Sequence, residues 1–482
     1  MAQAGQTKPK VLDTGVPNLD LVLGGGLQQH NSYLFVGGPG TGKSVLVQQI
    51  AFHRATLGER VLLVTGLDEP HHNLLEHLAT LRFVDAKLIG PQVETVSIVP
   101  FLDRPVPEKI NVLRKTVLNA RPKLVTIDGL RSFEAYLGGL EGVFEFLYGL
   151  TSWFAVEGIT LLLTKDCDPD AWAENPEYDL VDGIIALRRD LVDGRTVRRL
   201  WVRKMRGQNA LDGTHAFTLD ERGVTVWPRP QAVFHLQDRP APSARLPFGI
   251  ESLDAMLGGG LPEASTTLVA GDPGAGKTML ALAFMAGGAQ RGEPGLWVGF
   301  RESPAQLRAM GEAWGADLAS AVQFMVVAPL ELDPGEMAWL LQQRMAEVGA
   351  RRLVVDGAEA LAGAFPGERQ CSEFLAWLSR FAPQQGVTSL ITQSAPAETG
   401  PELRLATTPL ASLAQNVIVL RHVRQEDRLR RAIAILRLAS PDYDAAIREL
   451  VVTRSGIAVG DVLGAAGQPA EQASAELAGG RV

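Results

Sequence analysis

The sequence contains little cysteine and no long apolar run. Cys167 and Cys371 are the only cysteines among 482 residues, too few for a disulfide framework or a thiolate metal site, and typical of a reducing compartment. No apolar run approaches the roughly 18 residues that suggest a membrane span. The first residues, MAQAGQTKPKVLDTG, lack the apolar core of a signal peptide. These absences predict a cytoplasmic protein without a membrane segment.

The sequence also lacks an excess of positive charge. It has 46 Lys and Arg residues against 54 Asp and Glu residues, a net charge of -8. This balance argues against a protein that coats duplex nucleic acid, although a local basic groove would escape such a test. With 46% hydrophobic residues the composition is that of a globular protein, and the length predicts two domains rather than one.

An internal duplication organises the chain. TGVPNLDLVLGGGL at 14–27 matches FGIESLDAMLGGGL at 248–261, a shift of 234 residues. Further along the chain the shift settles at 228, as between Asp128 in KLVTIDGL and Asp356 in RLVVDGAE. Fixed offsets over several motifs indicate that one ancestral domain was duplicated.

The duplication predicts the domain boundaries. We expect a first domain at 10–230, a linker at 231–245 and a second domain at 246–460. The stretch WPRPQAVFHLQDRPAPSARLP around the linker is rich in proline, which favours an extended conformation. Residues 461–482 are rich in Ala and Gly, which predicts a flexible tail.

The fold class follows from short apolar runs that alternate with helical stretches. In the first half the runs are SYLFVG, RVLLVTG, KLVTID and ITLLLT. They do not alternate between polar and apolar residues, as expected for strands buried on both faces of a parallel sheet. The sequence therefore predicts an α/β protein with two tandem P-loop domains, each a mainly parallel, twisted sheet flanked by helices.

The sequence contains two complete motifs for phosphate-binding loops. GGPGTGKSVL (37–46) and GDPGAGKTML (271–280) both satisfy G-x-x-x-x-G-K-[ST] between a strand-like and a helix-like run. Their glycines let backbone N–H groups point at phosphate oxygens, and the lysine bridges the β- and γ-phosphates of ATP. The expected ATP-binding residues are Gly38, Pro39, Gly40, Thr41, Gly42, Lys43 and Ser44, and Asp272, Pro273, Gly274, Ala275, Gly276, Lys277 and Thr278.

Each loop has expected partners for Mg²⁺. Ser44 and Thr278 occupy the hydroxyl position of the motif that ligates the metal. Asp128 and Asp356 each end an apolar run, where a carboxylate can bind the metal or its water shell. An isolated aspartate after a strand is usually a cap or turn residue. Because this one recurs in register after both loops, we expect these four residues to hold Mg²⁺.

These motifs together resemble the KaiC family of RecA-like ATPases, which includes circadian-clock proteins. The resemblance covers residues 11 to 459, and its most specific segment is 198–228, which P-loop proteins in general lack. It implies a homohexameric double ring with ATP between neighbouring subunits. It also implies that Lys204 and Arg206, the Lys-x-Arg-Gly residues, reach the γ-phosphate of the adjacent subunit. An arginine supplied in this way is worth roughly 10³–10⁵ in rate; without the family, the same residues would be a solvated basic strand end.

The chain departs from the family where a catalytic base is expected. The family places two adjacent glutamates before Ser/Thr-Pro, whereas the first position here is Leu67 in one half and Arg301 in the other. Asp68 and Glu302 match the second glutamate, and Glu69 is an alternative base. Losing a positioned base typically lowers the rate by about 10²–10⁴, so slow hydrolysis is expected at both sites. Alternatively, the acids of the first half are solvated residues at a helix N-terminus.

The second half also lacks the trans arginine. Arg437 stands for the lysine and Ala439 for the arginine of the family motif. Arg301 could approach the nucleotide instead, or could form an ordinary ion pair with Glu302. We therefore expect the first half to hydrolyse ATP slowly and the second mainly to bind nucleotide and assemble the ring.

Three functions remain open. One is a slow nucleotide-driven switch whose ring state is read by an unknown protein partner, with residual autokinase activity an open point. The two positions that are phosphorylated in the family correspond to Ala411 and Ser412 in this chain. One hydroxyl that could accept a phosphate is therefore absent, and the other, on Ser412, is either a phosphosite or an exposed loop serine. The second is a RecA-type DNA-dependent ATPase, which would need basic glycine-rich loops that we do not find. The third is a scaffold in which ATP is structural. A nucleic-acid partner is not expected.

Overall fold

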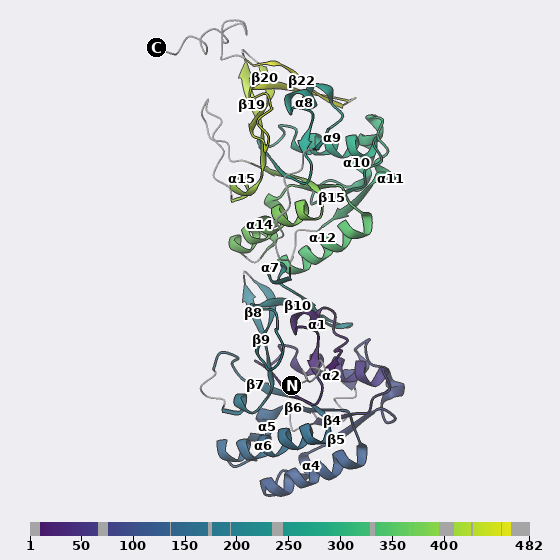
Figure 1. Cartoon of the computed structure of the whole chain (residues 1–482), viewed down its shortest axis with the longest axis vertical. Coiled ribbons are helices and arrows are strands. Elements are labelled where there is room, and N and C mark those ends of the chain that lie inside the picture. The colour runs from purple at the N-terminus through teal and green to yellow at the C-terminus, as the bar shows by residue number, and fades with distance from the viewer. Residues whose placement is uncertain are drawn as a thin grey trace, which may run out of the picture. The chain divides into compact units, whose positions relative to one another are not determined.

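The computed structural model describes residues 10–65, 76–134, 136–171, 176–192, 194–233, 244–327, 333–365, 367–394, 409–425, 428–454 and 456–463. The chain divides into two compact units, Met1–Val233 and Phe234–Val482, each of which is a layered α/β structure (Figure 1).

The first unit contains a nine-stranded sheet within its described residues, in the order β11-β10-β9-β8-β3-β7-β6-β4-β5. The strands of the first unit, inside and outside this sheet, are β1 (Val11–Leu12), β2 (Leu27–Gln28), β3 (Ser32–Gly37), β4 (Val61–Thr65), β5 (Val93–Ser97), β6 (Leu124–Asp128), β7 (Thr160–Asp166), β8 (Gly183–Val192), β9 (Arg195–Met205), β10 (His215–Asp220) and β11 (Gly223–Trp227). Its helices are α1 (Leu19–Val22), α2 (Lys43–Thr56), α4 (Val106–Ala120), α5 (Leu130–Glu134), α6 (Leu140–Glu157) and α7 (Pro230–Val233), with 3-10 turns η1 (Ala86–Leu88), η2 (Val99–Phe101) and η4 (Pro176–Asp179).

The second unit repeats this plan, and its described residues form a nine-stranded sheet in the order β16-β15-β17-β18-β14-β19-β20-β21-β22. Its strands are β12 (Arg245–Leu246), β13 (Leu261–Pro262), β14 (Thr266–Gly271), β15 (Gly295–Gly299), β16 (Val322–Val326), β17 (Arg352–Asp356), β18 (Thr388–Ser394), β19 (Asn416–Gln425), β20 (Arg428–Arg437), β21 (Arg448–Thr453) and β22 (Gly456–Val462). Its helices are α8 (Glu251–Met256), α9 (Lys277–Ala289), α10 (Pro304–Ala313), α11 (Leu318–Ala321), α12 (Pro334–Val348), α13 (Glu359–Ala364), α14 (Glu368–Gln384) and α15 (Pro409–Leu413).

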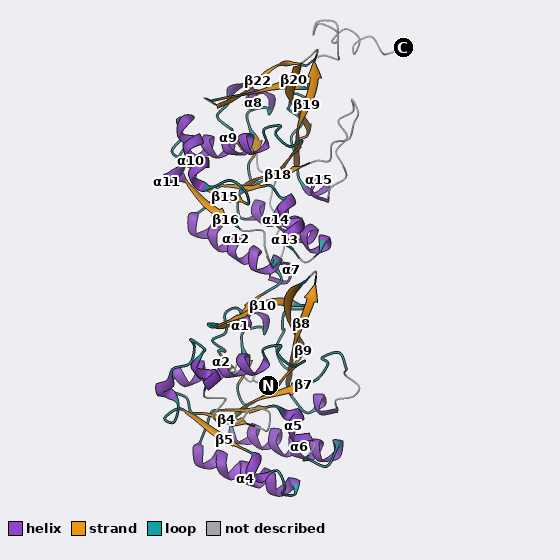
Figure 2. Cartoon of the chain, turned by 180° about the vertical axis from the view of Figure 1, so that it is seen from behind, coloured by secondary structure: helices purple, strands orange, loops and turns teal. Residues whose placement is uncertain are grey.

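Helices cover both faces of each sheet, which explains why the central strands are continuously apolar. In the first unit, Tyr33 and Phe35 of β3 belong to the core on the α2 side, whereas Leu34 and Val36 belong to the core on the α6 side. Figures 1 and 2 show the same layering in both units, with α2 or α9 on one side and α4 and α6, or α12 and α14, on the other. The predicted α/β class and the two tandem RecA-like domains are confirmed.

Two regions differ from the simplest expectation. Beyond β8 the sheet of the first unit continues with antiparallel strands β9, β10 and β11, formed by the segment that carries the family-specific pattern. The proline-rich stretch is not extended throughout, because Pro230–Val233 form α7 and Arg245–Leu246 pair with β13. The tail expected at 461–482 lies outside the described residues after 463.

Candidate functional site

The first P-loop joins the carboxyl end of β3 to the start of α2. Gly40 and Gly42 have φ angles of 70° and 104°, a left-handed conformation that other residues rarely adopt. Lys43 begins α2, and its ammonium donates hydrogen bonds to the carbonyl oxygens of Gly37 (3.0 Å) and Gly38 (2.9 Å). The lysine is thus folded back over its own loop, where the phosphates of a nucleotide would lie.

A hydroxyl and a carboxylate meet beside this loop. Ser44 donates to Asp128 Oδ1 at 3.0 Å, and Thr164 at the end of β7 donates to the same oxygen. Thr164 in turn accepts the backbone N–H of Gly129 at 2.8 Å. The threonine therefore orients Asp128 and ties the loop after β6 to the neighbouring strand.

The second site repeats these contacts residue by residue. Lys277 donates to the carbonyl oxygens of Gly271 and Asp272, each at 2.9 Å. Thr278 donates to Asp356 Oδ2 at 2.9 Å, and Thr392 donates to Asp356 Oδ1 at 2.6 Å. The two loops have the same internal geometry despite their different sequences.

Burial shifts the pKa values of the second site. Burial raises the pKa of Asp356, and the hydrogen bonds from Thr392 and Thr278 offset only part of this effect. Burial lowers the pKa of Lys277, although the charges of Glu359 and Asp356 act in the opposite direction. The second loop therefore holds its charged groups in a dry environment, in which a bound phosphate would interact strongly with them.

These residues fit Mg²⁺ and ATP. The hydroxyl of Ser44 lies 3.0 Å from the Asp128 carboxylate and the hydroxyl of Thr278 lies 2.9 Å from the Asp356 carboxylate, and hydroxyl and carboxylate oxygens are ligands that Mg²⁺ accepts. Within the described residues there is no cluster of three or more His, Cys, Asp or Glu side chains suited to a metal. This agrees with a P-loop site, where phosphates and water supply most ligands.

The acidic candidates have different outcomes. Asp68 and Glu69 lie outside the described residues. In the second unit, Ser303 caps helix α10 in a capping box with Gln306, so the Ser-Pro part of the motif starts this helix. Glu302 precedes the cap, and its negative charge contributes to the raised pKa of Asp356. Glu302 is therefore within electrostatic reach of Asp356, an expected metal-binding residue.

The structure reveals a carboxylate beside each P-loop lysine that the sequence did not indicate. In the first unit it is Asp166, whose Oδ1 lies 2.5 Å from Lys43 Nζ. In the second unit it is Glu359, which receives hydrogen bonds from the hydroxyl (2.8 Å) and backbone N–H (3.1 Å) of Ser394. Arg301 faces this Glu359 at 4.0 Å and is mostly exposed.

The two carboxylates occupy different positions of the repeat. At the offset of 228, Asp166 corresponds to Ser394 and Glu359 corresponds to Arg131. Burial would raise the pKa of Glu359, but hydrogen bonds from its own N–H and from Ser394, with the charge of Lys277, outweigh burial and lower it. The acid is therefore ionised at neutral pH.

A signal for the orienting threonines was present in the sequence. ITLLLT and GVTSLIT match at the same offset, and both end in the threonine that bonds the metal-site aspartate. The repeated threonine could be identified from the sequence, but its hydrogen bond to the aspartate depends on the order of the strands in the sheet.

The register of the sheet fixes the correspondence of the basic residues on the antiparallel strands β9 and β20. Lys204 on β9 pairs with Ile184 of β8, and Arg437 on β20 pairs with Val417 of β19. Both β8 and β19 run parallel to the strand before the P-loop, and both pairings contain an irregularity at this point. Arg437 therefore occupies the position of Lys204.

These basic residues contact backbone carbonyls of their own chain. Lys204 donates to the carbonyls of Tyr178 (2.8 Å) and Asp179 (3.3 Å), and burial and the nearby Arg206 lower its pKa. Arg206 is more exposed and lies 3.5 Å from Asp182. Arg437 donates to the carbonyls of Ala411 and Ala414.

The two positions that correspond to the family's phosphorylation sites lie on a short helix. Ser412 is exposed on α15, and Ala411 precedes it. Only one hydroxyl is therefore present at this pair of positions.

Among the described residues, no helix combines the length and the apolar character that crossing a bilayer requires.

Comparison with known proteins identifies the same repeat. A family model described as "ATPase: KaiC" matches residues 12–231 and again residues 246–463. The chain is 26% identical over 479 residues to the circadian clock protein KaiC3 of Synechocystis sp., with 93% of this chain and 91% of that protein covered. It is 23% identical over 467 residues to the circadian clock oscillator protein KaiC of Picosynechococcus sp., with 93% and 89% covered.

Proposed function

Because the chain belongs to the KaiC family of ATPases, we propose that it forms a hexameric ring that binds ATP at both P-loops and hydrolyses it slowly. In this proposal the first domain performs the turnover, while the second mainly holds nucleotide and stabilises the ring. Mg²⁺ would be held by Ser44 and Asp128 in the first site and by Thr278 and Asp356 in the second. Bound there, the metal would neutralise charge on the phosphates.

The observation that carries the proposal is the difference between the ends of the corresponding strands β9 and β20. In the first unit an exposed Arg206 follows Lys204, whereas in the second unit Ala439 follows Arg437 at the same place in the register. An arginine side chain that reaches a neighbouring subunit can neutralise charge developing on the γ-phosphate, and an alanine cannot. The second site has kept its binding residues without this group.

Slow turnover is supported by the residues at the expected base positions. Arg301 carries positive charge where the family has its first glutamate, and its guanidinium lies 4.0 Å from the Glu359 carboxylate. Leu67 stands at the corresponding position of the first half, where Asp68 or Glu69 would have to act. A base that must act from a neighbouring position is expected to lower the rate by about 10²–10⁴.

The ranking of the two sites is tested by Lys43→Ala and Lys277→Ala, each measured for phosphate release. Native mass spectrometry with and without ATP gives the fraction of chains in the ring, and turnover is expressed per assembled ring. We expect Lys43→Ala to remove most of the turnover and Lys277→Ala mainly to reduce assembly. Loss of most turnover per ring in Lys277→Ala would refute the ranking.

The same measurements separate the other functions. A wild-type ring that binds ATP without any phosphate release would be a scaffold with structural nucleotide. Stimulation of phosphate release by single-stranded DNA at moderate salt would indicate a RecA-type DNA-dependent ATPase. Residual autokinase activity would appear as phosphate on Ser412, and it should disappear in Ser412→Ala.

A further inference from the structure

A pocket of about 580 Å³ opens in the first unit at the end of the sheet opposite the P-loop. Arg60 and Lys123 in its wall immediately precede β4 and β6, and Thr160 begins β7. Because these strands run parallel to β3 and the P-loop follows the carboxyl end of β3, the pocket lies at the amino ends of the strands. It is therefore distinct from the nucleotide site.

The wall of this pocket is basic. Five of its residues carry a basic side chain and are exposed, namely Lys10, His30, Arg60, Arg121 and Lys123. The only acidic residue in the wall is Glu59, which is neutralised by Arg54 behind it. In the part of the chain that the structure describes, the five basic side chains form no ion pair with a carboxylate. The positive charges of the two lysines and two arginines are therefore available to a ligand.

The second unit shows that the fold does not require this charge. At the repeat offsets, the basic positions of the pocket are replaced by uncharged residues at all but one position, namely Ala244, Ala264, Pro294 and Gly349. The remaining cation, Arg351, corresponds to Lys123, and it forms an ion pair with Glu263. The residue that corresponds to Glu263 in the first unit is Gln29, which also lines the pocket. The first unit has thus kept the cation and lost the carboxylate that neutralises it.

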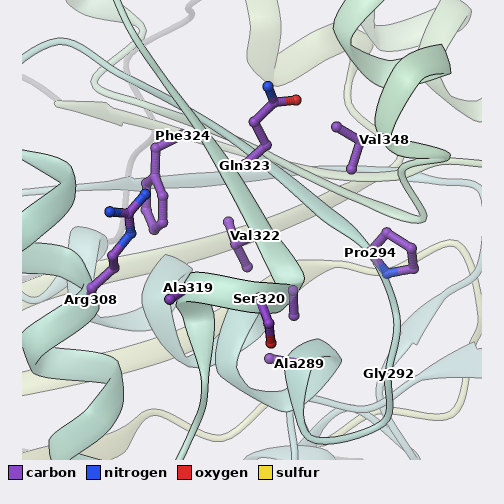
Figure 3. A pocket seen from close by; sticks show the side chains of 11 residues that line it. Ala289, Gly292, Pro294, Arg308, Ala319, Ser320, Val322, Gln323, Phe324 and Val348 are labelled. Atoms are coloured by element: carbon purple, nitrogen blue, oxygen red, sulfur yellow. The ribbon is translucent and has the colours of Figure 1, made fainter.

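A different hollow in the second unit, lined mainly by residues of α11 and β16, is poor in charge. It has a volume of about 640 Å³ and includes Gly292, the repeat partner of Gly58 (Figure 3). Its one charged residue is Arg308, whose guanidinium lies 5.2 Å from the ring centroid of Phe324. Only Gly292 and Pro294 of its lining occupy repeat positions of the basic pocket, so the loss of positive charge in the second unit is shown by the aligned residues rather than by this hollow.

We propose that the basic pocket of the first unit binds a small anion with two or more phosphate groups. Its volume lies within the range of roughly 300–1,000 Å³ that is typical of small-molecule sites. Two lysines and two arginines around one hollow match an anion of several charges better than a single carboxylate, and guanidinium groups suit phosphate oxygens in particular. A concave wall with a negative net charge on the whole chain favours a small ligand over a nucleic acid.

The second unit supplies the variants that test this site without disturbing the fold. Arg121 has a φ angle of 51° and Gly349 at the same position has a φ angle of 62°, so Arg121→Gly removes a charge and also relieves backbone strain. Gln29→Glu introduces the carboxylate that the second unit carries as Glu263. Lys115→Gln, an exposed residue of α4 outside the pocket, is the matched control for loss of one charge.

The experiment is a calorimetric titration of the full chain with inorganic tripolyphosphate. Both P-loops are first saturated with a non-hydrolysable ATP analogue, and Mg²⁺ is kept in excess over both ligands. We expect one tripolyphosphate bound per chain, about tenfold weaker binding in Arg121→Gly and in Gln29→Glu, and unchanged binding in Lys115→Gln. Affinity should also fall with added salt, because the charges are exposed.

Three results would overturn the proposal. They are the absence of saturable binding, an equal loss in all three variants, and binding that none of the variants changes. A single-stranded oligonucleotide or an acidic peptide that binds with the expected variant pattern, while tripolyphosphate does not bind, would also overturn it and would assign the pocket to a macromolecule.

Discussion

A buried arginine in the second unit allows a quantitative test of how the duplicated domains diverged. Arg352 is 0% exposed, and its guanidinium donates to Glu293 Oε2 (2.6 Å), the Phe284 carbonyl (2.6 Å) and the Pro247 carbonyl (3.0 Å). Burial lowers its pKa to about 10 against the opposing charge of Glu293, so it remains charged at neutral pH. Replacing it would remove this donor from the Phe284 carbonyl and would leave Glu293 and the Pro247 carbonyl with Arg291 as their remaining basic partner.

The first unit neutralises the corresponding glutamate from a different element. Glu59, the repeat partner of Glu293, pairs with Arg54 of helix α2, and Arg54 also donates to the carbonyl of Asp13 at 3.3 Å. Asp13 corresponds to Pro247 in the second unit. The guanidinium therefore fills the same place in both units, although it comes from α2 in one and from β17 in the other.

A unit cannot hold both arginines, one at the position of Arg54 and one at the position of Arg352, at the same time. The position of Arg54 is Gly288 in the second unit, and a Cβ atom on Gly288 would lie 2.6 Å from Cδ of Arg352. The position of Arg352 is Leu124 in the first unit, and this leucine is fully buried. We therefore expect Arg352→Leu and Gly288→Arg to destabilise the second unit separately and to compensate each other when combined.

The magnitudes follow from burial. Breaking a buried ion pair from one side costs about 3–5 kcal/mol, which is expected for Arg352→Leu. Overpacking by Gly288→Arg alone is expected to cost about 1–3 kcal/mol, whereas the double variant should lose less than Arg352→Leu alone. For a domain of this size, the loss in Arg352→Leu corresponds to a fall of roughly 10 °C in the melting temperature. The neighbouring Arg351→Gln, which removes a half-exposed ion pair, should cost less than about 1 kcal/mol.

The assay must report on the second unit alone, because two units need not unfold together. Hydrogen exchange followed by mass spectrometry over peptides of β14, β17 and β18 gives the free energy of opening of this sheet. A double variant whose loss equals the sum of the two single losses within about 0.5 kcal/mol would show that the sites are independent. That result would refute the inference that one guanidinium position is served by two alternative elements.

The remaining predictions concern the nucleotide sites and the lead-in to the first P-loop. Burial and the neighbouring Asp13 raise the pKa of Asp20 to about 6, so the folded first unit binds an extra proton below this pH and loses stability as the pH rises from about 4 to about 6. Asp20→Asn should flatten this fall, as measured by hydrogen exchange of the first unit across the same pH range. Thr392→Val removes the hydroxyl that donates to Asp356 and should weaken Mg²⁺-dependent ATP binding at the second site about fivefold, measured by calorimetry with Lys43→Ala as the background. Arg206→Ala should lower phosphate release per ring at least about a hundredfold, whereas Arg437→Ala should change it less than threefold; equal effects would contradict the trans role of Arg206.

Much of the central sheet could be predicted because its signals are local. The runs that became β3, β4, β6 and β7 are apolar throughout, which indicates strands buried on both faces of the sheet. The glycines of both loops carry their own conformational preference, so the P-loops and their lysines were assigned from a few residues each. Asp128 and Asp356 could be placed at strand ends because each directly ends an apolar run.

The duplication extended what the sequence could determine. It showed which residues of the loops and of the strand ends occupy equivalent positions, whereas the family's Lys-x-Arg-Gly pattern indicated that Arg437 and Ala439 replace Lys204 and Arg206 in the second half. The sheet register agrees with this alignment. The duplicated motifs and the family pattern together thus indicate a difference between the two sites from the sequence alone.

Only the tertiary structure decided which side chains meet across the sheet. Asp166 reaches Lys43 because β7 lies next to β3, and Glu359 reaches the second site because the loop after β17 lies beside β18. The basic pocket likewise gathers residues from the segments before β4, β6 and β7. Residues that are close in sequence determine the local backbone preference and the pattern of burial. The strand order that brings distant segments together arises only when the whole sheet is assembled. The two P-loops could therefore be predicted from the sequence, whereas the charged side chains that surround them could not.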